Sequence, residues 1–179
     1  MSHFEDLSSE ILMSIFEYMD VEDVWTIFFN MNSRLNSLVF DSHLRLTADV
    51  SKVEKSNFDQ FCISLLRTNF HNIFTLILSN NYYRYPQIQT FLSHTSFTAF
   101  QSLYSLTLID INHDELIEVS QQIQQLNNLN HLHINTHEIF NDKQLANVSS
   151  AVLDQPKLRV LGMRFHEVSQ DVLPRMKPI

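Results

Sequence analysis

Apolar and polar positions follow a helical spacing at the start of the chain. Ile11, Ile15 and Met19 are four residues apart, with Leu12 and Phe16 beside them, which predicts an amphipathic helix after Ser8 and Ser9, either of which can cap it. Two further short helices are predicted after Asp20 and Asn32, since both residue types can cap a helix amino terminus. Their apolar positions repeat the spacing: Val24, Ile27, Phe28 and Met31 in the second helix, and Leu35, Leu38 and Val39 in the third.

A short apolar pattern recurs in the rest of the chain. Segments 73–78, 103–108, 129–134 and 158–163 share the form apolar-x-x-apolar-x-apolar, and a weaker copy lies at Leu44 and Leu46. The central leucines, Leu76, Leu106, Leu132 and Leu161, are 30, 26 and 29 residues apart. Alternation with a period of two is typical of a strand. The pattern therefore predicts strands near 44–47, 74–79, 104–109, 130–135 and 159–164.

Helical patterns lie between the predicted strands. Apolar residues keep helical spacing in Ser56–Arg67, after Pro86, and in two segments that Asp114 and Asp142 can cap; a last short helix is predicted at Ser169–Leu173. Strands that alternate with helices are typical of parallel sheets. The sequence thus predicts an α/β protein in which three amino-terminal helices precede an array of alternating parallel strands and helices.

The amino-terminal helices have wider apolar faces than their own packing requires. The apolar residues of the first helix fill an arc of roughly 160°, and Trp25 and Phe29 widen that of the second helix to about 200°. A helix that packs on one core needs an apolar stripe of only about 100°. Three short helices cannot cover this surface among themselves, so we expect a second protein to cover the remainder.

This amino-terminal stretch resembles a known family, the F-box. The resemblance is in Leu7-x-x-Glu10-Ile11-Leu12-x-x-Ile15-Phe16-x-Tyr18-Met19-x-x-x-Asp23-Val24, followed by Asn32-Ser33-Arg34-Leu35-Asn36. In that family, a three-helix unit docks onto the small adaptor subunit of cullin-type (SCF) ubiquitin ligases. The resemblance implies that apolar side chains make the adaptor contact, namely Leu7, Ile11, Leu12, Ile15, Phe16 and Trp25. The chain departs from the family at Ser8, where proline is usual.

The recurring segments resemble irregular leucine-rich repeats, whose periods are roughly 20–29 residues. The resemblance implies stacked units, each of which buries a leucine-lined edge that it cannot cover alone. Residues on either side of each central leucine would then face outward, on the surface that often binds the ligand in this family. The candidate target-binding residues are on or near this surface: Arg45, Thr75, Ile77, Ser105, Thr107, His131, His133, Arg159 and Arg164. For any single one of them, ordinary strand surface is the alternative.

Composition and charge restrict the partners and the compartment. Hydrophobic residues make up 44% of the chain and charged residues 18%, with a net charge of -8, which is an ordinary globular balance. There is no basic stripe for nucleic acid, no apolar run long enough to span a membrane, and no positive flank for a secretory signal. The single cysteine, Cys62, suits a reducing compartment. We therefore expect a cytoplasmic or nuclear protein that binds neither nucleic acid nor membrane.

The residue types argue against an enzyme and against a bound cofactor. Gly162 is the only glycine, which excludes phosphate-cradling loops and the Gly-x-Ser-x-Gly nucleophile elbow. One cysteine excludes the zinc modules that recruit ubiquitin-conjugating enzymes, and Cys62 lies on the apolar side of a predicted helix, as a buried inert thiol would.

The one cluster that resembles a metal site is His131-x-His133-x-x-x-His137. His131 and His133 would point the same way on a strand and could share a metal. Their spacing also follows directly from the repeat, because both flank Leu132. We therefore expect polar surface histidines and no metal.

These patterns lead to one hypothesis and one alternative. The hypothesis is a non-enzymatic substrate receptor of a cullin-type SCF ubiquitin ligase, with an F-box at 1–42 that binds the adaptor subunit and a repeat array at 43–179 that recruits an unidentified target protein. The alternative is a leucine-rich-repeat interaction scaffold in which the F-box-like helices act only as an amino-terminal cap.

Overall fold

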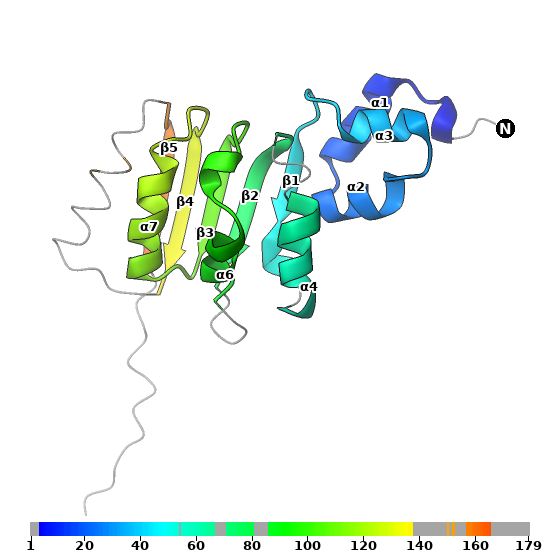
Figure 1. Cartoon of the computed structure of the whole chain (residues 1–179). Coiled ribbons are helices and arrows are strands. Elements are labelled where there is room, and N and C mark those ends of the chain that lie inside the picture. Colours follow the sequence, from blue (N-terminus) through cyan, green and yellow to red (C-terminus); the bar gives the residue numbers. More distant parts are fainter. Residues whose placement is uncertain are drawn as a thin grey trace, which may run out of the picture.

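The computed structural model describes residues 4–53, 55–66, 71–80, 86–137, 150, 152 and 157–165. These residues form a mixed α/β protein with one five-stranded sheet, in which the strands follow one another in chain order. Figure 1 shows helices α4, α6 and α7 on one face of this sheet and helices α1, α2 and α3 grouped beside its first strand. The predicted α/β class and the sequential parallel strands are confirmed.

The strands are β1 (Leu46–Asp49), β2 (Ile73–Ser79), β3 (Ser105–Ile109), β4 (His131–Thr136) and β5 (Val160–Phe165). All four neighbouring pairs are parallel, and each strand overlaps one of the predicted ranges. The central leucines lie in one continuous row, Leu76 beside Leu106, Leu106 beside Leu132, and Leu132 beside Leu161. The first three are fully buried and Leu161 is half-buried, as stacking of units that cannot bury this edge alone requires.

The α-helices of the described residues are α1 (Ser9–Glu17), α2 (Val21–Phe28), α3 (Ser33–Val39), α4 (Lys55–Gln60), α6 (Gln87–His94) and α7 (His113–Ile123). Helix α4 continues as the π-helix η3 (Phe61–Leu66), and three 3₁₀ turns complete the helical elements: η1 (Phe4–Asp6), η2 (Val50–Lys52) and η4 (Phe97–Ala99). Large aromatic side chains fill the space between these helices and the sheet: Phe58, Phe91, Phe97 and Phe100 are all fully buried. The helices predicted after Asp142 and at Ser169–Leu173 fall outside the described residues, apart from Ser150 and Val152.

Side-chain caps define where several helices begin. The predicted caps Ser8 and Asn32 accept hydrogen bonds from the backbone N–H groups of Ile11 and Leu35. The prediction that Asp114 caps α7 is wrong. Asn112 caps this helix instead, in a capping box with Glu115 in which each side chain accepts a hydrogen bond from the other residue's backbone N–H.

The Asn112–Glu115 pair also joins neighbouring units of the array. The Glu115 side chain is buried and accepts a hydrogen bond from Asn80 Nδ2, while Asn80 Oδ1 accepts one from the backbone N–H of Ile88 at the start of α6. One polar cluster therefore joins the amino termini of α6 and α7, two helices that lie on the same face of the sheet (Figure 1).

The amino-terminal helices abut the free side of β1. Asp20, which precedes α2, forms an isolated parallel bridge with Thr47 of β1. Lys52 Nζ lies 3.3 Å from Asp20 Oδ2 and 2.9 Å from Asp49 Oδ2, and these two carboxylates raise the pKa of Lys52, that of Asp49 having the larger effect. Asn72 Nδ2 donates to the Val39 carbonyl oxygen at the end of α3. The helices and the sheet consequently share one continuous apolar core.

The capping box provides a test of this arrangement. We expect Asn112→Ala to lower the free energy of unfolding by about 1 kcal/mol, the usual cost of losing an amino-terminal cap. Asn112→Ser, which keeps a cap acceptor, should stay close to the wild type. Urea denaturation followed by circular dichroism measures both, and equal stability of the alanine and wild-type chains would contradict the assignment.

Candidate functional site

Helix α1 carries two apolar stripes with different surroundings. At about 100° per residue, Leu12 and Phe16 lie on one side of the helix, whereas Ile11 and Ile15 lie on another side, about 100° away. The first pair is fully buried within the chain, at 0% exposure for each side chain. Phe16 stacks against Phe28 of α2 with ring centroids 4.6 Å apart.

The burial of Leu12 and Phe16 corrects the predicted adaptor contact. Both side chains are in the core that α1 shares with α2, α3 and β1, so in this structure neither one is on a surface that another protein can touch. The sequence pattern did not separate the two stripes, because it counted all apolar residues of the helix as one arc. The neighbouring β1 strand provides part of the cover that the three helices lack.

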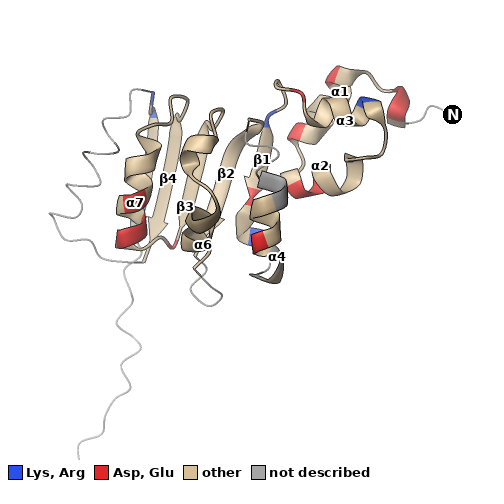
Figure 2. Cartoon of the chain, viewed as in Figure 1, with Lys and Arg blue, Asp and Glu red and all other residues tan. Residues whose placement is uncertain are grey.

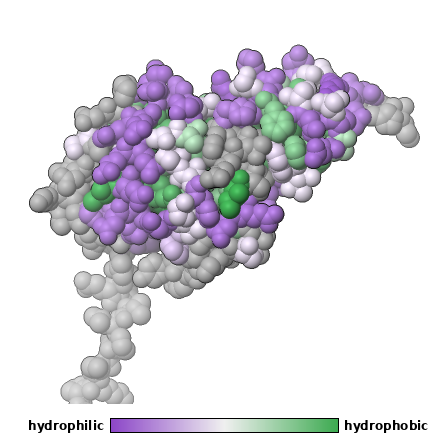
Figure 3. Space-filling model, in the orientation of Figure 1, coloured by the Kyte–Doolittle hydropathy of each residue, from purple (hydrophilic) through white to green (hydrophobic). Residues whose placement is uncertain are grey.

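A second stripe on α1 remains at the surface, and we call it the outer stripe. It consists of Ile11 and Ile15 on the helix and Tyr18 at its carboxyl-terminal cap, which lie within an arc of about 60°. Leu7 precedes the extended cap residue Ser8 and is partly buried against the core. Ile11 is 50% exposed and Tyr18 94% exposed, while Leu7 and Ile15 are half-buried. In Figure 3, apolar atoms reach the surface over the amino-terminal helices between hydrophilic groups. Two of the predicted adaptor-binding residues, Ile11 and Ile15, are thus together on one side of α1.

Trp25, the remaining predicted adaptor contact, belongs to a half-exposed aromatic cluster. Its ring stacks on Phe29 with centroids 3.9 Å apart. Both rings are nearly perpendicular to the ring of Phe40, with centroid distances of 5.9 Å for Trp25 and 6.0 Å for Phe29. Trp25 and Phe29 are half-buried and Phe40 is exposed. Phe40 follows α3, and the sequence analysis missed it because a single aromatic residue after a helix has no periodic neighbour.

Two apolar residues of the second amino-terminal helix also lie at the surface. Ile27 is 48% exposed and Met31 57% exposed, although their spacing placed them on the same face as Val24 and Phe28. Helix α2 ends at Phe28, so Met31 no longer follows the helical period. The apolar surface of the helical unit is therefore larger than the outer stripe alone.

The sheet presents the predicted target-binding residues in two rows. Thr75, Ser105 and His131 are register partners across β2, β3 and β4, and Ile77, Thr107 and His133 form the next row. These six residues are half-buried or exposed, and the leucines between them are buried. The predicted orientation of these positions is confirmed, since residues two apart on a strand share a face.

The predicted cations lie at different ends of this face. Arg45 and Arg159 precede β1 and β5 at the amino-terminal ends of the strands, whereas Arg164 pairs in register with Asn135 farther along β5. Arg45 lies over the ring of Phe74, with its guanidinium carbon 4.9 Å from the ring centroid. Figure 2 shows basic residues near the starts of β1 and β5, while acidic residues gather on the amino-terminal helices and at one end of α7.

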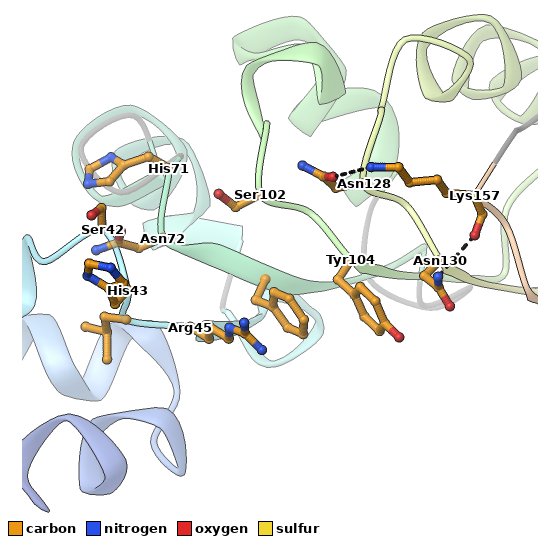
Figure 4. Close-up of a pocket in the computed structure, with 12 residues that line it drawn as sticks. Ser42, His43, Arg45, His71, Asn72, Ser102, Tyr104, Asn128, Asn130 and Lys157 are labelled. Atoms are coloured by element: carbon orange, nitrogen blue, oxygen red, sulfur yellow. Dashed lines mark hydrogen bonds between the residues drawn. The ribbon is translucent and has the colours of Figure 1, made fainter. Parts of the chain in front are cut away.

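An open hollow of about 520 Å³ lies at the amino-terminal ends of the strands. Its floor is a row of rings, in which Phe74 stacks on Tyr104 with centroids 4.7 Å apart and Tyr104 contacts the tilted ring of His131 at 5.0 Å. Polar residues from the segments before all five strands line this space, among them Asn72, Tyr104 and Asn130 (Figure 4). The sequence analysis did not predict the hollow, because its residues flank the strand pattern on which that analysis relied.

The three histidines of the possible metal motif do not converge. His137 Nε2 lies 2.8 Å from Asp110 Oδ1. His133 faces Gly162, where a Cβ atom would lie 2.5 Å from His133 Nδ1. His131 instead stacks on Tyr104. Within the described residues, no group of three histidine, cysteine or acidic side chains could hold a metal ion.

Comparisons with known proteins do not assign the chain to a family. A scan against family models and a search of curated proteins both found no match. No helix of the described residues is long and apolar enough to cross a membrane. The function is therefore inferred from the surfaces described above.

Cys62 is buried, as predicted, and burial raises the pKa of its thiol to about 12, with a smaller contribution from the charge of Asp59. The thiolate is the reactive form, so its population near pH 8 falls about 1000-fold relative to a thiol with a pKa near 9. We expect thiol reagents such as Ellman's reagent to label the native chain very slowly and the guanidinium-unfolded chain at once. Rapid labelling of the native protein would contradict the burial.

The two stripes of α1 should differ sharply in their effect on stability. Leu12→Ala should lower the free energy of unfolding by about 2–5 kcal/mol, because it leaves a cavity in the core. Ile11→Ala should change it by less than about 1 kcal/mol, because Ile11 is half-exposed. Urea titration of both variants checks the assignment, and similar losses would contradict it.

Proposed function

We propose that the chain is the substrate receptor of a cullin-type ubiquitin ligase, in which helices α1–α3 bind the small adaptor subunit and the sheet face binds a target protein. One observation carries the proposal: the outer stripe stays exposed on a helix whose other apolar side is already buried. An apolar helix face at the surface is typical of a docking site for another protein.

The surroundings of the outer stripe fit an interface. Ile11 and Ile15 are four residues apart on one helix and Tyr18 follows three residues later, which is a spacing used when a helix packs into an apolar groove. Exposed acidic residues flank it, with Glu10 and Glu17 on the same helix. A polar rim around an apolar centre is the usual composition of a protein interface. The Trp25 cluster adds aromatic surface, and tryptophan is enriched among residues that dominate binding.

The proposed activity is positional and involves no chemistry by this chain. The adaptor-binding helices and the sheet share one apolar core, so two partners bound to them would be held at a set separation. Holding a target near the site of ubiquitin transfer raises its effective concentration there.

A second candidate function rests on a different observation. The bridge between Asp20 and Thr47 and the burial of Leu12 and Phe16 against the array are what a terminal cap would need. In that case the chain is an interaction scaffold, and its amino-terminal helices only cover the outer edge of β1.

Adaptor binding separates the two candidates. We expect the wild-type chain to bind the purified adaptor subunit, and we expect Ile11→Asp combined with Ile15→Asp to weaken binding by more than about 100-fold, because two carboxylates would be desolvated at the interface. Isothermal titration calorimetry measures the affinity, and circular dichroism verifies that the variant is folded.

A matched control places the same two charges elsewhere. Gln89→Asp combined with Ser93→Asp changes two exposed positions four residues apart on α6, and it should bind the adaptor like the wild type. If the wild-type chain does not bind the adaptor, the second candidate is supported, in which the amino-terminal helices are only a cap. Undiminished binding by the Ile11 and Ile15 variant would show that the outer stripe is not the interface.

A further inference from the structure

The hollow at the amino-terminal ends of the strands has an unbalanced charge. The side chains that line it include Arg45, Lys157, His43 and His71, and none of the lining residues that the structure describes is acidic. This contrasts with the chain as a whole, whose net charge is -8. The nearest charge compensation is Asp41, whose Oδ1 lies 2.9 Å from His43 Nδ1. Arg45 and Lys157 are the permanent cations among the described lining residues.

The hollow also contains buried hydrogen-bond acceptors without partners in the described residues. Asn72 is 1% exposed, and its Nδ2 donates to the Val39 carbonyl oxygen, which leaves Oδ1 unpaired. Asn130 Oδ1 is likewise buried and unpaired, while its Nδ2 donates to the Lys157 carbonyl oxygen. A buried polar atom without a partner costs about 1–3 kcal/mol. A ligand that brings N–H donors would recover part of this cost.

The positions of these groups define the shape of a ligand. Arg45 precedes β1 and Lys157 precedes β5, so four interstrand spacings, about 19 Å in total, separate the starts of their strands. About six residues of extended peptide cover this length. The ring row of Phe74 and Tyr104 forms a floor between the two cations, on which a peptide backbone can lie (Figure 4).

We propose that this hollow binds an extended acidic segment of the target protein. Carboxylates about six residues apart would pair with Arg45 and Lys157, and backbone N–H groups between them would donate to Asn72 and Asn130. A nucleic acid is disfavoured, because its backbone carries a charged phosphate at every nucleotide, whereas the described lining offers only Arg45 and Lys157 as permanent cations, enough to pair with two carboxylates. This inference rests on the proposed function only for the origin of the segment, and the binding itself is measured without the adaptor.

The test uses the full chain and capped octaglutamate as the probe, at low ionic strength. We expect octaglutamate to bind and capped octaglutamine to bind at least about threefold more weakly. Isotope-labelled chain observed by NMR should show shifts in the side-chain amide signals of Asn72 and Asn130. Arg45→Gln and Lys157→Gln should each weaken binding about threefold, the usual range for an exposed ion pair.

Lys52→Gln is the matched control, because it removes one exposed cation that does not line the hollow and was not predicted to bind the target. It should leave the affinity for octaglutamate unchanged. Equal weakening by all three variants would reduce the effect to general charge attraction and overturn the proposal. Equal binding of octaglutamine, tighter binding of an oligothymidine at the same residues, or no amide shift up to millimolar peptide would also overturn it. If octaglutamate binds and the adaptor does not, the ligase function fails and the peptide site stands.

Discussion

The structure depends on burying the leucine row of the sheet. Leu76, Leu106 and Leu132 stack across neighbouring strands, and no single strand-and-helix unit can remove its own leucine from water. The same need exists at the first strand, where Leu46 is fully buried although β1 has a strand partner on one side only. Leu12 and Phe16 of α1 belong to the core that closes this end. The amino-terminal helices are therefore part of the fold of the array as well as a surface of their own.

The separation of the two stripes explains how α1 can contribute to the core and still present apolar side chains at the surface. Leu12 and Phe16 satisfy the core, and the helix period places Ile11 and Ile15 on a side that β1 cannot reach. A helix that served only as a cap would need a single apolar stripe with polar residues elsewhere. The exposed isoleucines are not part of the described core, and their presence on the surface is the observation that favours the proposed adaptor contact over a simple cap.

The elements that repeat along the chain could be predicted, and the junctions between them could not. The leucine pattern located all five strands and the outward positions from Thr75 to His133, because a period of two determines which side chains share a face. The Asn-x-x-Glu capping box of α7 is local and was readable from the sequence, whereas the contacts of Asn80 with Glu115 and of His137 with Asp110 join different units and were not. For the same reason, the burial of Leu12 could not be read from the α1 pattern: it depends on the position of β1.

The two surfaces of the molecule differ in chemistry, and this difference matters for the proposed function. The outer stripe is apolar with an acidic surround, while the amino-terminal ends of the strands offer cations, amides and aromatic rings. A partner suited to one surface is poorly suited to the other. An apolar groove placed over the hollow would leave Asn72 and Asn130 unpaired, and an acidic segment placed on the outer stripe would be repelled by Glu10 and Glu17. A receptor that must hold two different proteins at once needs this kind of separation. Because one continuous core connects the two surfaces, an adaptor and a target bound to them would keep a defined distance, which is the property that raises effective concentration in a positional mechanism.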